Sequence, residues 1–365
     1  MNPPINSKEN IAFVGALPPP LGGVGVINKS FQEIVSPQWN VIAFNTSTGK
    51  LNEDLYKIKG FKNLWHFIKN IYGLLQFLRK NSFKVVNVFS TSNIAFIRDS
   101  VIIVLLWICR KKIVIHFHSK KKGEFFLHPY TIGYISFIFR LAKKVIVLSQ
   151  DHYQYFSQYF DKSKMVVIEN FVDYKLYDCE IEKKGMEFLY VGRLSEKKGF
   201  FDLIKAVKIV KEKGFTIKIN VLGTAENEDI KILVDKELKN NNLEENIILK
   251  GHVQGIQKYD YYKKCRIFIF PSHYENSPVV LKEAIASKMA IICSDIEANK
   301  IILKDKGNTR FFVSENAADL ATKIEDLLLE DYSVEEYMRN SERCKKYDKE
   351  YANSKINDLF LELQN

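Results

Sequence analysis

Two successive series of alternating strand-like and helix-like segments constrain the fold of this chain more than any other feature. In the first half, apolar runs typical of buried strands occupy residues 11–17, 40–46, 84–90, 112–118, 145–149 and 165–169. In the second half, they occupy residues 187–192, 216–222, 246–250, 266–270, 290–294 and 310–313. Segments of helical length lie between them, at 63–79, 130–142, 199–213, 229–240, 255–263, 278–288 and 316–330. This alternation predicts an α/β fold of two doubly wound, Rossmann-like domains, with their parallel sheets facing a shared cleft.

The chain of 365 residues is long enough for two buried cores. Residues 172–186, VDYKLYDCEIEKKGM, are polar and lack periodicity, so they are the best candidate for a linker. We predict a first domain over residues 1–177, a second over 178–345, and a C-terminal helix over 346–365 that packs back on the first domain.

Positive charge is concentrated in the first half of the chain. Residues 1–180 contain 23 Lys and Arg against 12 Asp and Glu, whereas residues 181–365 contain 31 of each. This excess predicts an anionic partner, either a bilayer surface or a phosphate-bearing substrate; the alternative is a solvated basic face. Nucleic acid is less supported, because the basic residues form short clusters that flank apolar helices and no nucleic-acid motif is present.

The longest apolar run, Val101–Cys109, is too short for a membrane span, which needs about 20 residues. The five cysteines are scattered and contain no CxxC pair, as is typical of reduced thiols. We predict a cytoplasmic protein that associates peripherally with the inner face of the cytoplasmic membrane.

The loop after the first predicted strand, PPPLGGVGVINKSF, contains Gly22, Gly23 and Gly25. Glycines there let the backbone approach a ligand and open a helix whose N-terminus attracts an anion; the alternative is a simple tight turn. Asn28 replaces the third glycine of the dinucleotide fingerprint, so NAD is not expected.

Basic residues follow the first strand of the second half, in YVGRLSEKKGFFDLI. Arg193 and Lys198 lie between a strand and a helix, where two cations can neutralise a diphosphate; the alternative is a solvated turn. We expect no cofactor and no metal, because the chain has no D-x-D and no third ligand near His116 and His118. One of these two histidines, with His116 the first choice, is expected to contact substrate; the alternative is a half-buried strand histidine.

Two carboxylates, Glu275 and Glu283, flank Pro278 in PSHYENSPVVLKEAIA. Pro278 can stand in the first turn of a helix, which leaves free amides beside the ligand. Glu283 would then accept hydrogen bonds from vicinal hydroxyls such as those of ribose, and Glu275 from a second group on the phosphates. The alternative for Glu283 is a carboxylate on a helix surface. Together with the two cations, the pair suits a nucleoside diphosphate joined to a sugar.

These segments resemble glycosyltransferase family 4, and the resemblance extends over nearly the whole chain. Members of this family are retaining, nucleotide-sugar-dependent enzymes with the GT-B fold. ENSPVVLKE is similar to the E-x7-E element of the family, and GRLSEKKG to its G-R-L-x-x-x-K-G element. The segments VIENFVD, VLGTAEN, LKGHV, PPPLGGVG and HFHS resemble further family motifs.

The resemblance implies a metal-independent, retaining hexosyltransferase of polysaccharide or lipopolysaccharide synthesis, including O-antigen and capsule. The enzyme would use a UDP-sugar in preference to a GDP-sugar. It would transfer the sugar to a saccharide acceptor that is linked to a lipid. The catalytic residues would be His116, Arg193, Lys198 and Glu275. The donor would contact Gly23, Gly25, Arg193, Lys198, Gly223, His252, Val253, Glu275, Asn276, Ser277, Pro278, Val279 and Glu283. The acceptor would contact Gly22, Gly23, His116 and His118.

Many family members have E-G-F-G where this chain has Glu275-Asn-Ser-Pro278, so the sequence leaves the donor sugar open. Two other functions also stay open: a non-catalytic protein that binds a nucleotide-sugar or an anionic surface, and a GT-B nucleotide-sugar epimerase.

Overall fold

The computed structural model describes residues 8–18, 23–47, 61–91, 94–118, 129–178, 185–303, 309–329 and 345–365. The chain forms two compact units, residues 1–170 with 350–365, and residues 171–349. These boundaries differ from the predicted 177/178 and 345/346. The short helix α7 (Tyr174–Tyr177), within the predicted linker, packs in the second unit, where Tyr177 is buried.

The first unit is built on a six-stranded parallel sheet in the order β2-β1-β3-β4-β5-β6. Its strands are β1 (Asn10–Gly15), β2 (Asn40–Asn45), β3 (Val85–Ser90), β4 (Lys112–Phe117), β5 (Lys144–Val147) and β6 (Met165–Val167). Each of them lies within a residue range predicted from the apolar runs, except that β1 and β5 begin one residue before theirs. The sheet confirms the predicted α/β class for this half.

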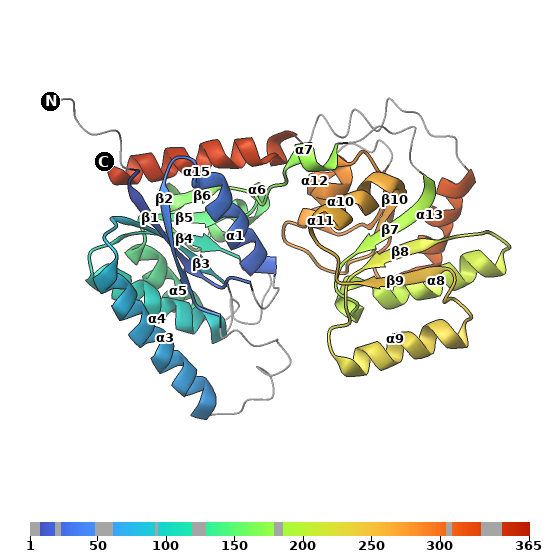
Figure 1. Cartoon of the computed structure of the whole chain (residues 1–365), viewed down its shortest axis with the longest axis horizontal. Helices are drawn as coiled ribbons and strands as arrows, with labels where there is room; N and C mark the ends of the chain where they lie inside the picture. Colours follow the sequence, from blue (N-terminus) through green and yellow to red (C-terminus); the bar gives the residue numbers. More distant parts are fainter. Residues whose placement is uncertain are drawn as a thin grey trace. The chain divides into compact units, whose positions relative to one another are not determined.

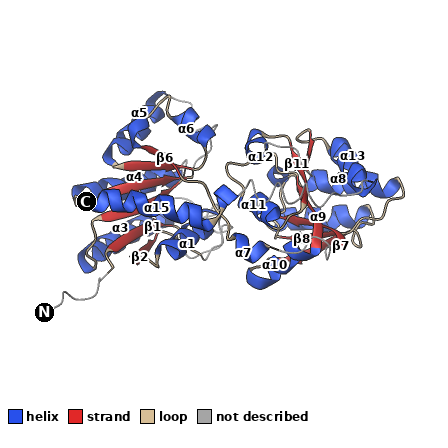
Figure 2. Cartoon of the chain, turned by 90° about the horizontal axis from the view of Figure 1, so that it is seen from above, coloured by secondary structure: helices blue, strands red, loops and turns tan. Residues whose placement is uncertain are grey.

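Helices cover both faces of the first sheet (Figures 1 and 2). On one face, α3 (Phe61–Lys80), α4 (Ile94–Ile108) and α5 (Pro129–Leu141) cover side chains such as Ala12 and Val14. The opposite face carries α1 (Gly23–Val35), whose Phe31 contacts Phe89. The helix α6 (Gln150–Phe156), which the sequence pattern did not predict, precedes β6.

The C-terminal helix, α15 (Lys349–Gln364), packs on the same face as α1 (Figure 2). The Phe360 ring lies 6.1 Å from that of Phe13 and 6.2 Å from that of Trp39. The Trp39 indole Nε1 donates a hydrogen bond of 2.7 Å to Asn357 Oδ1. The last helix therefore completes the core of the first unit.

The second unit is built on another six-stranded parallel sheet, in the order β12-β11-β10-β7-β8-β9. Its strands are β7 (Gly185–Val191), β8 (Ile219–Leu222), β9 (Ile247–Gly251), β10 (Cys265–Phe270), β11 (Ala290–Ser294) and β12 (Thr309–Phe312). The chain runs outward from β7 to β9 and then returns to the other side of β7 with β10. The carboxyl ends of β7 and β10 therefore form a topological switch point, the position where open α/β sheets bind ligands.

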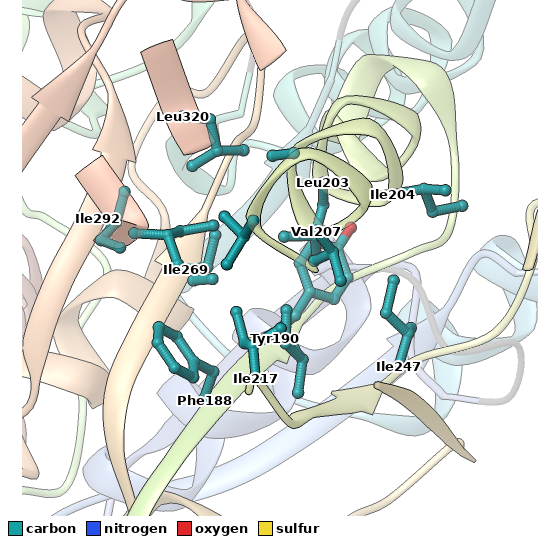
Figure 3. Packing of buried hydrophobic residues seen from close by; sticks show 14 of the residues in the cluster. Phe188, Tyr190, Leu203, Ile204, Val207, Ile217, Ile247, Ile269, Ile292 and Leu320 are labelled. Carbon is teal, nitrogen blue, oxygen red and sulfur yellow. The ribbon is translucent and has the colours of Figure 1, made fainter. Parts of the chain in front are cut away.

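Helices of the second unit include α8 (Phe200–Glu212), α9 (Glu228–Asn240), α10 (Gly255–Lys264), α11 (Val279–Ala286), α12 (Glu297–Ile302) and α13 (Ala317–Leu329). The sequence pattern missed only the six-residue α12 among these. Figure 3 shows α8 side chains, including Leu203 and Val207, packed over strand residues such as Tyr190 and Ile269. This apolar core fixes the strand ends from which the functional loops leave.

Within the part of the chain that the structure describes, no helix combines the length and the apolar character needed to cross a bilayer.

Candidate active site

Two of the predicted ligand-binding residues meet at the switch point of the second sheet. Lys198 ends the short 3₁₀ helix η3 (Glu196–Lys198) after β7, and Glu275 lies in the loop between β10 and α11. The Lys198 Nζ lies 2.6 Å from Glu275 Oε1. The side chain of Glu275 is 12% exposed and that of Lys198 is 37% exposed. The ammonium therefore remains accessible to an anionic ligand while it neutralises a largely buried carboxylate.

Close backbone packing holds the loop after β7 against the loop after β10. Gly199 has φ +66°, and a Cβ at this position would lie 1.9 Å from the carbonyl oxygen of Pro271. The His273 amide donates a hydrogen bond of 3.1 Å to the Lys197 carbonyl. The His273 Nε2 also lies 2.6 Å from Oδ2 of Asp202, on the first turn of α8. The loop after β10 is thus anchored on both sides of the segment that carries Lys198.

Arg193 leaves β7 in the same loop but is held less firmly. Its guanidinium lies 3.9 Å from Glu226 Oε1, and both side chains are more than two-fifths exposed. Exposed ion pairs contribute about 0–1 kcal/mol to stability. The pair with Glu226 therefore hardly opposes the movement of Arg193 to another anionic partner. Its backbone is fixed, because the Tyr190 hydroxyl donates a 2.9 Å hydrogen bond to the Arg193 carbonyl.

Gly223 follows β8, and the backbone packing beside it explains why a glycine is present. A Cβ at this position would lie 1.8 Å from the carbonyl oxygen of Gly192. The glycine predicted to contact the donor therefore has a demonstrable role in the approach of two loops.

The second predicted carboxylate, Glu283 on α11, is buried in a network of hydrogen bonds. Its Oε1 accepts from the Tyr177 hydroxyl at 2.7 Å and from Lys258 Nζ at 2.6 Å, and its Oε2 accepts from the Tyr262 hydroxyl at 2.7 Å. The side chain of Glu283 is 6% exposed and that of Lys258 is 21% exposed. A carboxylate can accept about four hydrogen bonds, so these three leave one position on Oε2. A vicinal diol would require Lys258 to move or to share its acceptor.

Both tyrosines act as donors to Glu283 because their hydroxyls remain protonated. Burial and the adjacent Glu283 carboxylate raise the pKa of Tyr177 and that of Tyr262 well above the usual value. The tyrosines and Lys258 were absent from the sequence-based set. They lie on α7 and α10, as many as 106 residues from Glu283, and no motif in their segments marks them.

The loop before α11 contains the remaining donor residues predicted from the E-x7-E element. Pro278 immediately precedes the helix, with φ −68° and ψ 114°, and Val279 is the first helical residue. The expectation of Pro278 within the first turn was wrong by one residue, because its ψ is extended. Asn276 Oδ1 accepts from the Tyr274 hydroxyl at 2.8 Å, and Ser277 Oγ accepts from Lys282 Nζ at 2.9 Å.

His252 and Val253 follow β9, the edge strand of the second sheet. His252 is exposed and contacts Gln254, whereas Val253 packs against the apolar cluster that contains Tyr177 and Tyr262.

The histidines predicted to contact substrate belong to the first unit. His116 is 0% exposed, and its ring lies 4.4 Å from that of Phe89 and 4.7 Å from those of Phe31 and His118. His118 follows β4 and is partly exposed. Burial lowers the pKa of His118 to about 3 and that of His116 well below its usual range, so both rings are neutral at neutral pH. Of the two, His118 has the surface that a ligand could contact.

The glycine loop lies partly outside the described residues, which exclude Gly22. Gly23 and Gly25 begin α1. A Cβ at Gly23 would have no neighbour within 4 Å, and one at Gly25 would lie 3.5 Å from the Ala16 carbonyl oxygen. Packing against the described residues therefore does not require glycine at either position.

The described residues contain no group of three or more His, Cys, Asp or Glu side chains that could hold a metal ion. Metal independence stays a prediction.

Two family models cover most of the chain. Residues 178–350 match "Glycosyl transferases group 1", and residues 38–176 match "Glycosyltransferase Family 4". The chain belongs to glycosyltransferase family 4. The resemblance drawn from the motifs is confirmed, and the two parallel sheets with flanking helices are the GT-B architecture of this family.

Individual relatives of the family match shorter stretches. The capsular polysaccharide biosynthesis glycosyltransferase CapM of Staphylococcus aureus is 30% identical over 166 residues, 43% of this chain and 42% of that protein. The N-acetylgalactosamine-N,N'-diacetylbacillosaminyl-diphospho-undecaprenol 4-alpha-N-acetylgalactosaminyltransferase of Campylobacter jejuni is 34% identical over 128 residues, 35% of this chain and 32% of that protein. The chain thus matches less than half the length of either relative.

A solved family structure agrees over nearly the whole chain. Anabaena HepE, solved with UDP and glucose, has a TM-score of 0.75 at 15% identity, with 97% of this chain and 100% of that chain covered. At this identity the agreement shows the fold.

Proposed function

We propose that this family 4 protein transfers a sugar from a nucleoside diphosphate sugar, with UDP as the preferred nucleotide, to a saccharide acceptor in cell-surface polysaccharide synthesis. The observation that carries the proposal is the contact of Lys198 with Glu275 at the switch point of the second sheet. Arg193 leaves the same loop, and Glu283 lies on the helix that follows Glu275. The names of the CapM relative and of HepE solved with UDP and glucose support the pathway and the nucleotide.

The contact gives a physical account of donor binding. A diphosphate that approaches Lys198 competes with Glu275 for the ammonium, and a charge-assisted bond to phosphate replaces the one to carboxylate. The Glu275 carboxylate is then free to accept hydrogen bonds from hydroxyls of the donor sugar. Binding of the two halves of the donor is thereby coupled through one exchange of partners.

Departure of the nucleoside diphosphate needs stabilisation of the negative charge that develops on it. Lys198 and Arg193 supply two cations for this purpose, and fixed charges that interact more strongly with the transition state than with the ground state accelerate the reaction. In the proposed reaction, the transferred sugar retains its anomeric configuration and no metal is required. Glu283 accepts hydrogen bonds from the ribose hydroxyls, and Lys258 either shares the Glu283 Oε1 with them or moves away from it.

The proposed acceptor is a lipid-linked saccharide at the inner face of the cytoplasmic membrane. Support comes from the positive charge of residues 1–180 and from the Campylobacter relative, whose name includes diphospho-undecaprenol. The acceptor would contact the first unit through the segment around Gly23 and through His118.

The decisive experiment measures release of nucleoside diphosphate from UDP-sugars and GDP-sugars, with and without saccharide acceptors. Acceptor-dependent release of UDP supports transfer. A rise in melting temperature with UDP-sugar but no turnover with any acceptor would favour a non-catalytic binding protein. A new nucleotide-sugar formed without acceptor would favour an epimerase.

A further inference from the structure

One outer surface of the first unit is apolar and aromatic although it lies on helices of a water-facing layer. It is formed by α3, α4 and α5, which pack side by side over one face of the first sheet (Figure 1). Its exposed large apolar side chains are Trp65, Ile68, Tyr72, Leu75, Ile97, Trp107, Ile108, Tyr130, Tyr134 and Phe137. We call this set the aromatic face.

The spacing of these side chains shows that they lie on the sides of the helices that point away from the sheet. On α3, Leu74 is fully buried, whereas Trp65 and Tyr72 are 63% and 62% exposed. On α5, Ile135 is fully buried, whereas Tyr130 and Phe137 are 83% and 55% exposed. Single exposed apolar residues are ordinary, but a set that spans three adjacent helices is typical of an interaction surface.

The charges on the same three helices are almost entirely positive. Asp99 is the only acidic residue in α3, α4 and α5; it is 2% exposed, and Arg98 lies 2.7 Å from its Oδ1. Lys69, Arg79 and Lys80 are exposed on α3. The aromatic face thus presents cations to a partner and no accessible carboxylate on its helices.

We propose that the aromatic face docks on an anionic lipid bilayer. Trp and Tyr favour the boundary between headgroups and acyl chains, and each Lys or Arg near an anionic surface adds attraction. A second copy of this chain fits less well, because a two-fold contact would bring two positive surfaces together without acids to pair them. The helices lie in the plane of the interface, since α4, with 15 residues, is shorter than the about 20 residues of a span.

The test measures co-sedimentation of the full chain with phosphatidylcholine vesicles, with and without phosphatidylglycerol. No donor or acceptor is added, so failure of docking is distinguishable from failure of the proposed sugar transfer. We expect binding to the anionic vesicles that weakens with salt. Two of the three tryptophans, Trp65 and Trp107, lie on the aromatic face, while Trp39 is 6% exposed. Their fluorescence should shift to shorter wavelength when the vesicles bind.

Matched variants locate the contact. Combined replacement W65Q/Y72Q/F137Q should weaken vesicle binding by about tenfold or more, because it removes aromatic area from the bilayer boundary. The control Y351Q/L361Q removes exposed apolar side chains, 48% and 53% exposed, from α15 on the opposite face of the sheet, and should bind like the wild type. Circular dichroism and melting temperature establish that both variants are folded.

A charge pair of variants separates the electrostatic part. K69E/R79E should lower binding to the anionic vesicles about tenfold, whereas K29E, on α1 at the opposite face, should change it little. Wild-type binding that is absent, or unchanged by both the aromatic and the charge variants, would overturn the proposal. A second pair of results would also overturn the proposal: the wild type forms a dimer in solution that is lost in the aromatic variant, and the wild type does not bind vesicles.

Discussion

Lys198 Nζ lies 2.6 Å from Glu275 Oε1, although 77 residues separate them in sequence. The contact exists because β7 and β10 are neighbours in the second sheet and release their following loops at the same edge. It joins a cation from one family motif to a carboxylate from another. The pair is therefore the position at which we propose that the charge of a diphosphate is neutralised.

Replacement of Lys198 by methionine should lower kcat/KM for the nucleotide-sugar by about 100- to 1000-fold, the cost typical of removing one preorganised donor at a developing anion. Initial rates of nucleoside diphosphate release measure the effect. Lys197 is the matched control, since it is adjacent, exposed and equally charged. If K197M and K198M lose equal activity, Lys198 has no specific role.

Removal of either tyrosine hydroxyl from the Glu283 network should destabilise the second unit. Y177F and Y262F each leave a buried carboxylate oxygen with one donor fewer, at a cost of about 1–3 kcal/mol in the free energy of unfolding. Urea denaturation measures this cost. Y261F, on the same helix as Tyr262 and only partly buried, is the control and should unfold like the wild type.

The same variants should raise KM for the donor more than they lower kcat, because Glu283 would lose its fixed orientation toward ribose. A loss of stability with an unchanged KM would assign the network to folding alone.

The neutral histidines of the first unit should make its stability depend on pH. Burial lowers the pKa of His118 to about 3 in the folded chain, against a usual value near 6.5. Between these values the unfolded chain binds more protons, so the free energy of unfolding should fall as the pH is lowered from about 6.5 toward 3. Urea denaturation at a series of pH values measures this slope.

H118N should reduce the slope, whereas H252N, at an exposed position after β9, should retain it. A wild-type free energy of unfolding that is constant from neutral pH to pH 5 would contradict a lowered pKa of His118 in the folded chain.

The fold was predictable because its signal is local. Each strand of the two sheets is a short apolar run between polar segments, and the alternation with helices implies parallel pairing. The pattern failed for α6, α7 and α12, which are too short to show helical periodicity. The predicted linker includes α7, because Tyr177 lies within a polar stretch of the sequence although its ring is buried.

Candidate site residues that follow strand ends were predicted from the sequence, and so was Glu283 on the helix after Glu275. Lys198 and Glu275 were identified by position, and the structure brings them together. Lys258 and Tyr262 contact Glu283 from the side of α10, and contacts between separate helices leave no spacing signal in the sequence. His116 and His118 illustrate a further limit, because neighbouring strand-end positions do not reveal which ring the other elements cover.

The final prediction concerns the glycine that sets the position of Lys198. G199A should destabilise the chain by more than the about 1–2 kcal/mol that a left-handed conformation costs a residue with a Cβ, because the new Cβ would lie 1.9 Å from the Pro271 carbonyl oxygen. Gly214 provides the control: its φ is +86°, and a Cβ there would have no neighbour within 4 Å. G214A should therefore show the conformational cost alone in urea denaturation.

Because Pro271 begins the loop that carries Glu275, G199A should also impair nucleoside diphosphate release, and G214A should not. Equal unfolding free energies for the two variants would mean that the loops after β7 and β10 can separate without cost. In that case close packing of their backbones could not be what holds Lys198 beside Glu275.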